Sequence, residues 1–165
     1  MNRILKKTIA IIISVITACF VMLEAQAAQV ELEDVVLSQE QFNEILSNVH
    51  STDSVARSSS LITEYGVGAA KDGSKIIITA KTVCATSVTK CGLKELVVQR
   101  RVSDQYEWSD YLVYEDLYAD TYTHALSKSV TVTSGYQYRV TAVHYAKKSL
   151  LSTEKAESTS NIVWI

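Results

Sequence analysis

Apolar and polar side chains alternate along the chain from residue 61 onward, and turn residues interrupt the alternation about every ten to fifteen positions. Val, Ile, Thr and Tyr, which favour strands, dominate this part. In one segment, for example, Ile76, Ile78 and Ala80 fall on the same face. The pattern predicts an all-β fold, a seven-stranded antiparallel sandwich. The expected strands are residues 61–69, 75–84, 93–102, 108–114, 123–133, 136–145 and 160–165.

Residues 28–60 form an acidic spacer ahead of these strands, and one part of it follows a helical pattern. Ser38 and Gln41 have the spacing of a capping box, in which each side chain bonds the backbone N–H of the other residue. Apolar residues follow at i, i+3, i+4 and i+7, namely Phe42, Ile45, Leu46 and Val49. We expect a short amphipathic helix over residues 38–49. A helix of this length is marginal in water, so its apolar stripe should dock, either on the sandwich or on a partner.

The first 27 residues have the three parts of a secretory signal. The start is basic, residues 9–23 form an apolar run, and A-Q-A at residues 25–27 offers small side chains to a signal peptidase. An uncleaved membrane anchor is the alternative, but the run is shorter than the roughly 20 residues that a spanning helix needs. We expect cleavage after Ala27, a secreted protein, and three parts: the signal 1–27, the spacer 28–60 and the sandwich domain 61–165.

A different export chemistry is conceivable at Cys19. I-T-A-C at residues 16–19 resembles the lipobox of bacterial lipoproteins, in which the cysteine is lipidated and becomes the new N-terminus. The apolar run continues through Leu23, whereas lipoproteins usually turn polar after the cysteine. Lipidation would hold the protein at the outer face of the membrane, and cleavage after Ala27 would remove Cys19.

The charge balance limits the partners. The formal net charge is −2, and loss of the basic signal makes the exported chain more acidic. Arg100-Arg101 and Lys147-Lys148 are isolated basic pairs. Such a balance argues against nucleic acid or an anionic membrane surface as the main partner. We expect an unidentified protein or glycan at the cell surface, with membrane contact only through the signal segment or lipidation at Cys19.

Two cysteines, Cys84 and Cys91, remain after cleavage, and they are spaced C-x6-C. In an oxidising compartment such a pair indicates a disulfide. A metal site is the alternative, but no histidine or acid lies between the two cysteines, and a closed zinc site needs four ligands. We therefore expect a disulfide and no metal.

The segment V-T-S-G-Y-Q-Y-R-V at residues 132–140 resembles the L-x-P-G-T-x-Y-x-V segment of fibronectin type III domains. The resemblance implies an immunoglobulin or fibronectin type III-like sandwich, in which Tyr138 is the structural tyrosine corner, its hydroxyl bonded to backbone upstream. It also implies that Val132, Val140 and Ala142 face the core. The chain departs from the family at Ser134, where the family has proline, and it lacks the core tryptophan expected in the strand 75–84.

The order of signal, acidic spacer and sandwich, together with Y-R-V-T-A-V-H-Y at residues 138–145, is similar to a family of small secreted proteins of Gram-positive bacteria. That resemblance implies location and fold and brings no assigned activity or site residues.

The sequence offers few groups for catalysis. The three histidines are His50, His124 and His144, and only His144 is in phase with the inward-facing side of its strand. A lone inward histidine is usually a hydrogen-bonded structural group. The motifs of serine hydrolases, zinc proteases and phosphate-binding loops are absent from the sequence. We expect no catalytic residues and no cofactor, and a small secreted hydrolase using His144 with an acid such as Glu154 is the less favoured alternative.

Aromatic residues concentrate in one segment and give the most informative functional signal. They are Tyr106, Trp108, Tyr111, Tyr114, Tyr118 and Tyr122. They could anchor a protein partner, stack on the sugar rings of a glycan, or simply cover the sheets of a tyrosine-rich sandwich. A binding surface would place several of these rings on one face, with Trp108 and Tyr114 as the expected pair. We expect a secreted, non-catalytic interaction or structural module, with glycan binding as the main alternative.

Overall fold

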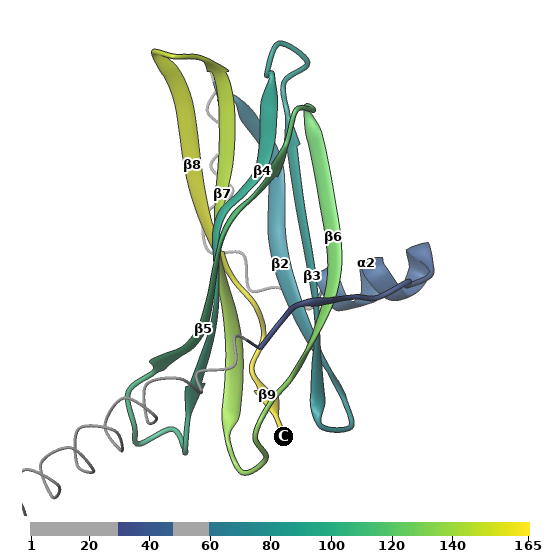
Figure 1. The fold of residues 1–165 in the computed structure, drawn as a ribbon, viewed down its shortest axis with the longest axis vertical. Coiled ribbons are helices and arrows are strands. Elements are labelled where there is room, and N and C mark those ends of the chain that lie inside the picture. Colours follow the sequence, from purple (N-terminus) through teal and green to yellow (C-terminus); the bar gives the residue numbers. More distant parts are fainter. Residues whose placement is uncertain (1–29, 48–59) are drawn as a thin grey trace, which may run out of the picture. The chain divides into compact units, whose positions relative to one another are not determined.

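The computed structural model describes residues 30–47 and 60–165 (Figure 1). The chain divides into two compact units, Met1–Val30 and Glu31–Ile165, and every element described below belongs to the second. The expected signal segment, Cys19 and the cleavage after Ala27 lie outside the described residues, as do His50 and the last two residues of the expected helix.

The described residues form ten elements, mostly strands, as the alternation predicts. In chain order they are β1 (Glu33–Asp34), α2 (Gln39–Ser47), β2 (Ile62–Asp72), β3 (Lys75–Cys84), β4 (Lys90–Arg101), β5 (Ser109–Ala119), β6 (Thr123–Thr131), β7 (Gln137–Ser149), β8 (Ser152–Thr159) and β9 (Val163–Trp164).

The strands pair in two antiparallel sheets that form a sandwich-like arrangement (Figure 1). One sheet has the order β1-β6-β3-β2, and the other has the order β5-β4-β7-β8, with β9 also paired to β7. The all-β expectation is therefore confirmed at the level of two packed antiparallel sheets. The strand list differs from the expected seven. β8 was not expected, β5 extends beyond the expected strand 108–114 to Ala119, and only two residues of the expected last strand are β.

The core lies where the alternation places it. Ile76, Ile78 and Ala80 of β3 are fully buried, as are Tyr138 and Val140 of β7. Lys75 and Lys81, at the two ends of this stretch of β3, and Arg139, between Tyr138 and Val140 of β7, are half-buried at the outer faces. The two inner faces therefore share one apolar interior of interdigitated aliphatic side chains. Val102 is an exception, because it is exposed in the turn after β4 instead of facing the core.

Helix α2 begins with the expected capping box. The Ser38 N–H donates to Gln41 Oε1 at 3.0 Å, and the Gln41 N–H donates to Ser38 Oγ at 3.2 Å. These bonds satisfy backbone donors that the first helical turn otherwise leaves unpaired. None of the helices in the described residues is long and apolar enough to cross a membrane.

The apolar stripe of α2 docks on the outer face of β2 and β3. A track of small residues makes room for it: a Cβ added to Gly68 would lie 2.2 Å from the carbonyl oxygen of Ile45. In the sheet, Gly68 and Ala70 of β2 pair with Thr79 and Ile77 of β3. Thr79 and Ile77 are buried on the side of the sheet that α2 covers. The sequence left open whether the helix docks on the sandwich or on a partner, and in the structure it docks on the sandwich.

The hydroxyl of Thr79 under this helix is unusual. Among the described residues it is the one buried side-chain nitrogen or oxygen with no hydrogen-bond partner. It lies 3.0 Å from the position of a Cβ added to Gly68. A buried polar group left unpaired opposes folding, so the contact between α2 and the sheet is not fully optimised.

Candidate binding surface

Trp108 lies on the outer face of the β5-β4-β7-β8 sheet, immediately before β5. The guanidinium groups of Arg101 and Arg139 approach the centre of its ring to 4.4 and 4.5 Å. Two glutamines fix the arginines: Arg101 Nε donates to Gln137 Oε1 and Arg139 Nε donates to Gln99 Oε1, each at 2.7 Å. Burial and the nearby charge of Arg101 lower the pKa of Arg139. Trp108 therefore packs against the protein's own cations, which occupy ring surface that a sugar would need.

Tyr111 belongs to a second stack, at one end of the interior. The guanidinium of Arg100 lies 4.4 Å from the centre of the Tyr111 ring and 4.7 Å from that of Tyr136. Both rings also contact the buried ring of Tyr138 edge-on, at centroid distances of 5.9 and 6.3 Å. The position of Tyr111 is thus explained by packing around Tyr138.

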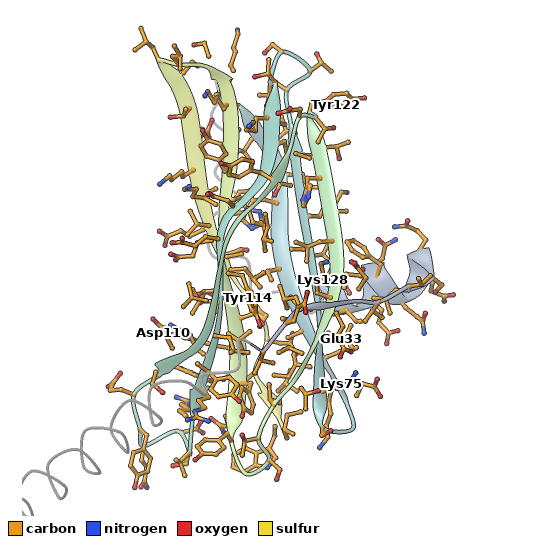
Figure 2. The ribbon with its side chains drawn as sticks, in the orientation of Figure 1. Glu33, Lys75, Asp110, Tyr114, Tyr122 and Lys128 are labelled. Atoms are coloured by element: carbon orange, nitrogen blue, oxygen red, sulfur yellow. The ribbon has the colours of Figure 1, made fainter. Side chains whose placement is uncertain are left out.

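The other expected aromatics are scattered. Tyr114 is opposite the buried Leu96 of β4 and so faces inward. Tyr118 is opposite Gly92 and packs on Tyr145 at the outer face, with ring centroids 5.4 Å apart. Two further rings, Tyr106 and Tyr122, are exposed near chain turns, and Figure 2 shows Tyr122 well apart from Tyr114.

The expectation that Trp108 and Tyr114 share a face is wrong. The register between β4 and β5 shifts between Val98 and Gln99, where β5 has one residue more than β4. The extra residue reverses the alternation, so Trp108 and Tyr114 point to opposite faces of the sheet. Trp108 lies with the arginines outside, and Tyr114 lies opposite Leu96 inside. The six aromatics therefore do not form one continuous surface.

The outer face of this sheet does contain a shallow trough, which the sequence did not indicate. It has a volume of about 510 Å³ and lies over Val143 of β7. Its walls are side chains of the sheet itself: Lys94 and Glu95 of β4, and Lys155 and Glu157 of β8. Lys94 pairs with Asp116, whereas Glu95, Lys155 and Glu157 form no ion pair with any described residue. An apolar floor between unpaired charges of both signs suits a polar partner surface.

His144 is buried in the core as expected, and both ring nitrogens are occupied. Its Nδ1 lies 2.7 Å from Thr82 Oγ1, and its Nε2 lies 2.7 Å from Ser158 Oγ. The Tyr65 ring packs on the imidazole with centroids 5.0 Å apart. Burial lowers the pKa of His144 to about 3, which keeps the ring neutral. His144 thus has the structural role that a lone inward histidine usually has.

Glu154, the acid considered as a partner of His144, is used elsewhere. Its carboxylate accepts hydrogen bonds from the Ser60 hydroxyl and from the Leu61 backbone N–H. On β8 it is opposite Ala146, while His144 is opposite Ala156. Glu154 is therefore not placed beside the imidazole, which is closed to solvent.

Cys84 and Cys91 are buried neighbours at the junction of β3 and β4, and both are free thiols. Their sulfurs are 2.9 Å apart, whereas a disulfide bond measures about 2.05 Å. Burial raises the pKa of both thiols. The two sulfurs are not at disulfide distance in this structure, and the disulfide stays a prediction.

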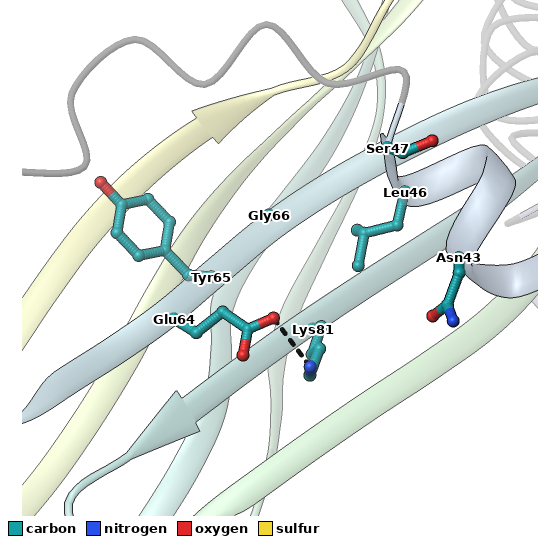
Figure 3. Close-up of a pocket in the computed structure, with 7 residues that line it drawn as sticks. All are labelled: Asn43, Leu46, Ser47, Glu64, Tyr65, Gly66 and Lys81. Carbon is teal, nitrogen blue, oxygen red and sulfur yellow. Dashed lines mark hydrogen bonds and ion pairs between the residues drawn. The ribbon is translucent and has the colours of Figure 1, made fainter.

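A separate pocket of about 330 Å³ opens beside the end of α2 (Figure 3). Asn43, Leu46 and Ser47 line it from the helix, and the ion pair between Lys81 Nζ and Glu64 Oε1, 2.7 Å long, closes its floor (Figure 3). It is open and small, and its charges are already paired. It carries no arrangement that points to a reaction.

No cluster of three or more histidine, cysteine or acidic side chains suited to a metal ion occurs among residues 30–47 and 60–165. Comparison of the chain with protein-family models, with curated proteins and with solved structures gives no match.

Proposed function

We propose that this protein is a secreted, non-catalytic interaction module with an immunoglobulin or fibronectin type III-like sandwich. The strand order and the hydrogen bond from Tyr138 to Thr133 support that fold type. Burial of Val132, Val140 and Ala142 supports it further. The basic start, apolar run and A-Q-A segment of the first 27 residues support export.

The observation that carries the proposal is the trough on the outer face of β4, β7 and β8. Its floor residue Val143 is half-buried, and Glu95, Lys155 and Glu157 around it have no charged partner in the described residues. Unpaired charges of both signs at fixed positions favour one partner orientation over others. The occupant that fits is a protein surface with an apolar centre and complementary charges.

The proposal is tested by capture followed by a matched pair of variants. The exported protein is cross-linked to cell-surface proteins of the cells that produce it, and the captured partner is identified and purified. Binding is then measured for Glu157→Lys, which reverses a charge at the trough, and for Thr131→Lys, which adds a charge on the exposed side of β6. We expect Glu157→Lys to weaken binding about tenfold or more and Thr131→Lys to leave it unchanged. Equal affinities for the two variants would remove this face from consideration.

Glycan binding, the alternative from the sequence, has weaker support in the geometry. Trp108 contacts two guanidinium groups, and Lys90 and Lys94 lie 5.0 and 5.8 Å from the centre of the Tyr118 ring. These rings are engaged within the protein and are not laid out as one platform. Retardation of the protein in gels that contain cell-wall polysaccharide, lost in Trp108→Ala while the fold is retained, would restore the glycan alternative.

A hydrolase is the least supported function. His144 is closed to solvent and is held by two hydroxyls, and Glu154, the acid considered for it, hydrogen-bonds elsewhere. A base with a pKa of about 3 cannot take up a proton efficiently near neutral pH.

A further inference from the structure

Two leucines form the turn between β7 and β8. Leu150 and Leu151 occupy the turn positions, and Ser149 and Ser152 pair across it. Leu150 is 88% exposed and Leu151 is 100% exposed. Adjacent large apolar side chains fully in water gain nothing from the hydrophobic effect, and such positions are usually polar.

The backbone of the turn does not explain leucine either. Two-residue hairpin turns favour Asn, Asp and Gly, because the preferred turn types need positive φ angles. Within the described residues only Asp116 and three glycines have positive φ, so neither leucine does. The pairing slips between Lys147 and Ser149, which places Lys148 in an irregular position just before the turn. A residue that its local backbone structure disfavours, and that gains no packing contact in return, is expected mainly at functional sites.

Two cations precede the two leucines in the chain. Lys148 is exposed and Lys147 is half-buried, and neither forms an ion pair with a described residue. Glu154, the first acidic residue after the turn, hydrogen-bonds to Ser60 and Leu61 and forms no ion pair with Lys147 or Lys148. The tip is therefore locally basic and apolar although the chain as a whole is mildly acidic.

We infer that this hairpin tip docks the protein on an anionic lipid bilayer. Leu150 and Leu151 enter the boundary between headgroups and acyl chains, and Lys147 and Lys148 lie at the anionic headgroups. Figure 1 shows the β7–β8 turn at the same end of the sandwich as the β5–β6 connection, and Tyr122 is exposed at that end (Figure 2). A tyrosine ring suits the interface, with its apolar body in the lipid and its hydroxyl in water.

This docking differs from the membrane contact expected from the sequence, which ran only through the signal segment or Cys19. It also differs from partner binding at the trough, because it uses other residues at one end of the molecule. Two leucines and two lysines bury little area, so the binding is weak, reversible and dependent on anionic lipid.

The test uses the chain from Ala28, which contains the whole compact unit Glu31–Ile165 and lacks both signal and Cys19. Its cosedimentation is measured with phosphatidylcholine vesicles that either contain or lack phosphatidylglycerol. We expect binding only when phosphatidylglycerol is present, and weaker binding as salt is raised. Absence of binding to both vesicle types would overturn the inference.

The decisive variant is Leu150→Asn with Leu151→Gly, which installs a preferred hairpin turn. We expect it to lower vesicle binding by about tenfold or more while leaving the thermal midpoint unchanged or raised. Val36→Ser is the matched control, because Val36 is also 100% exposed but lies before α2, away from the hairpin. It should bind as the unaltered chain does.

Two outcomes would count against lipid docking. Equal loss of binding in Val36→Ser and the turn variant would show a non-specific apolar effect. A turn variant that binds vesicles normally but loses self-association in sedimentation would assign the leucines to a contact between two copies of the chain.

Lys148→Ser should weaken binding to the phosphatidylglycerol vesicles and reduce its salt dependence.

Discussion

The hydroxyl of Tyr138 on β7 donates a 2.7 Å hydrogen bond to the carbonyl oxygen of Thr133, five residues upstream. The ring of Tyr138 is fully buried, and burial raises the pKa of its hydroxyl. The bond therefore ties the start of β7 to the turn after β6 from inside the core. Its loss would leave the Thr133 carbonyl without this partner.

Removal of that hydroxyl should destabilise the fold. We expect Tyr138→Phe to lower the free energy of unfolding by about 1 to 3 kcal/mol, because one hydrogen bond is lost and a carbonyl loses its donor. Tyr136→Phe is the control, since the half-buried Tyr136 packs beside Tyr138 through its ring. Urea denaturation of both variants makes the measurement. A loss of only a few tenths of a kcal/mol for Tyr138→Phe would deprive the fibronectin-like interpretation of its best support.

The His144 network should make stability depend on pH. Thr82 gives its hydroxyl hydrogen to the Gly92 carbonyl at 3.2 Å, so we assign the proton of the neutral imidazole to Nδ1, with Nε2 accepting from Ser158. The folded pKa of about 3 lies below the unfolded value of about 6.5. Between these values the unfolded chain binds the additional proton, and stability falls as pH falls.

Because of His144, the free energy of unfolding should fall by about 1.4 kcal/mol for each pH unit below pH 6.5, and this decrease should end near pH 3. The contribution is fully present above pH 6.5. Chemical denaturation at pH 7 and at pH 5, compared between the unaltered chain and His144→Gln, isolates this contribution from that of the carboxylates. Equal pH dependence in both chains would mean that the buried ring is not the source.

Gly68 should determine how closely α2 packs on the sheet. The Cβ of Gly68→Ala would overlap the Ile45 carbonyl oxygen, and since that atom belongs to the backbone, the helix must move. We expect faster hydrogen exchange at Phe42–Ser47 with little change in β4 and β7, whose amides serve as the internal control. Unchanged exchange across α2 would show that the helix does not depend on this close contact.

Thr79 offers the opposite change. Thr79→Val keeps the side-chain shape and removes the buried hydroxyl that has no partner. We expect the free energy of unfolding to rise by about 1 kcal/mol, measured by urea denaturation. Destabilisation instead would indicate that the hydroxyl has a partner, such as a bound water.

The pair Cys84 and Cys91 should form a disulfide in the exported protein. The loop between them is short, and closing it stabilises the fold by about 2.5 kcal/mol in the chain-entropy model. We expect no thiol labelling of the unfolded protein under non-reducing conditions and a lower thermal midpoint after reduction. A variant with Cys84→Ala and Cys91→Ala should be insensitive to reductant. Two reactive thiols in the exported protein would contradict this prediction.

Local signals in the sequence predicted local structure well. The capping box at Ser38 and the inward alternation of β3 depend on near neighbours in the chain, and both are found in the structure. β8 escaped notice because S-T-E-K-A-E-S-T has no apolar alternation, and it is a strand because β7 pairs with it along one edge. β8 follows β7 directly along the chain, and it is a strand because of that pairing and not because of an apolar periodicity of its own.

The candidate surface was predictable only in part. The arginines around Trp108 come from β4 and β7, so their approach depends on sheet register. The register shift between Val98 and Gln99, which the alternation does not reveal, then changes which side chains share a face. The trough around Val143 likewise exists only once three strands are aligned.

Because α2 packs over β2 and β3, its loss by proteolysis should change the behaviour of the protein. β2 is an edge strand, and its outer side beside α2 is a flat track of Gly68, Ala70 and the adjacent Ile77. A chain shortened to begin at Ser60 would present that flat, apolar strip together with an open strand edge, the two features that let sheets of separate molecules stack. The helix thus acts as a shield against aggregation, and we expect proteolysis that removes it to increase self-association of the chain.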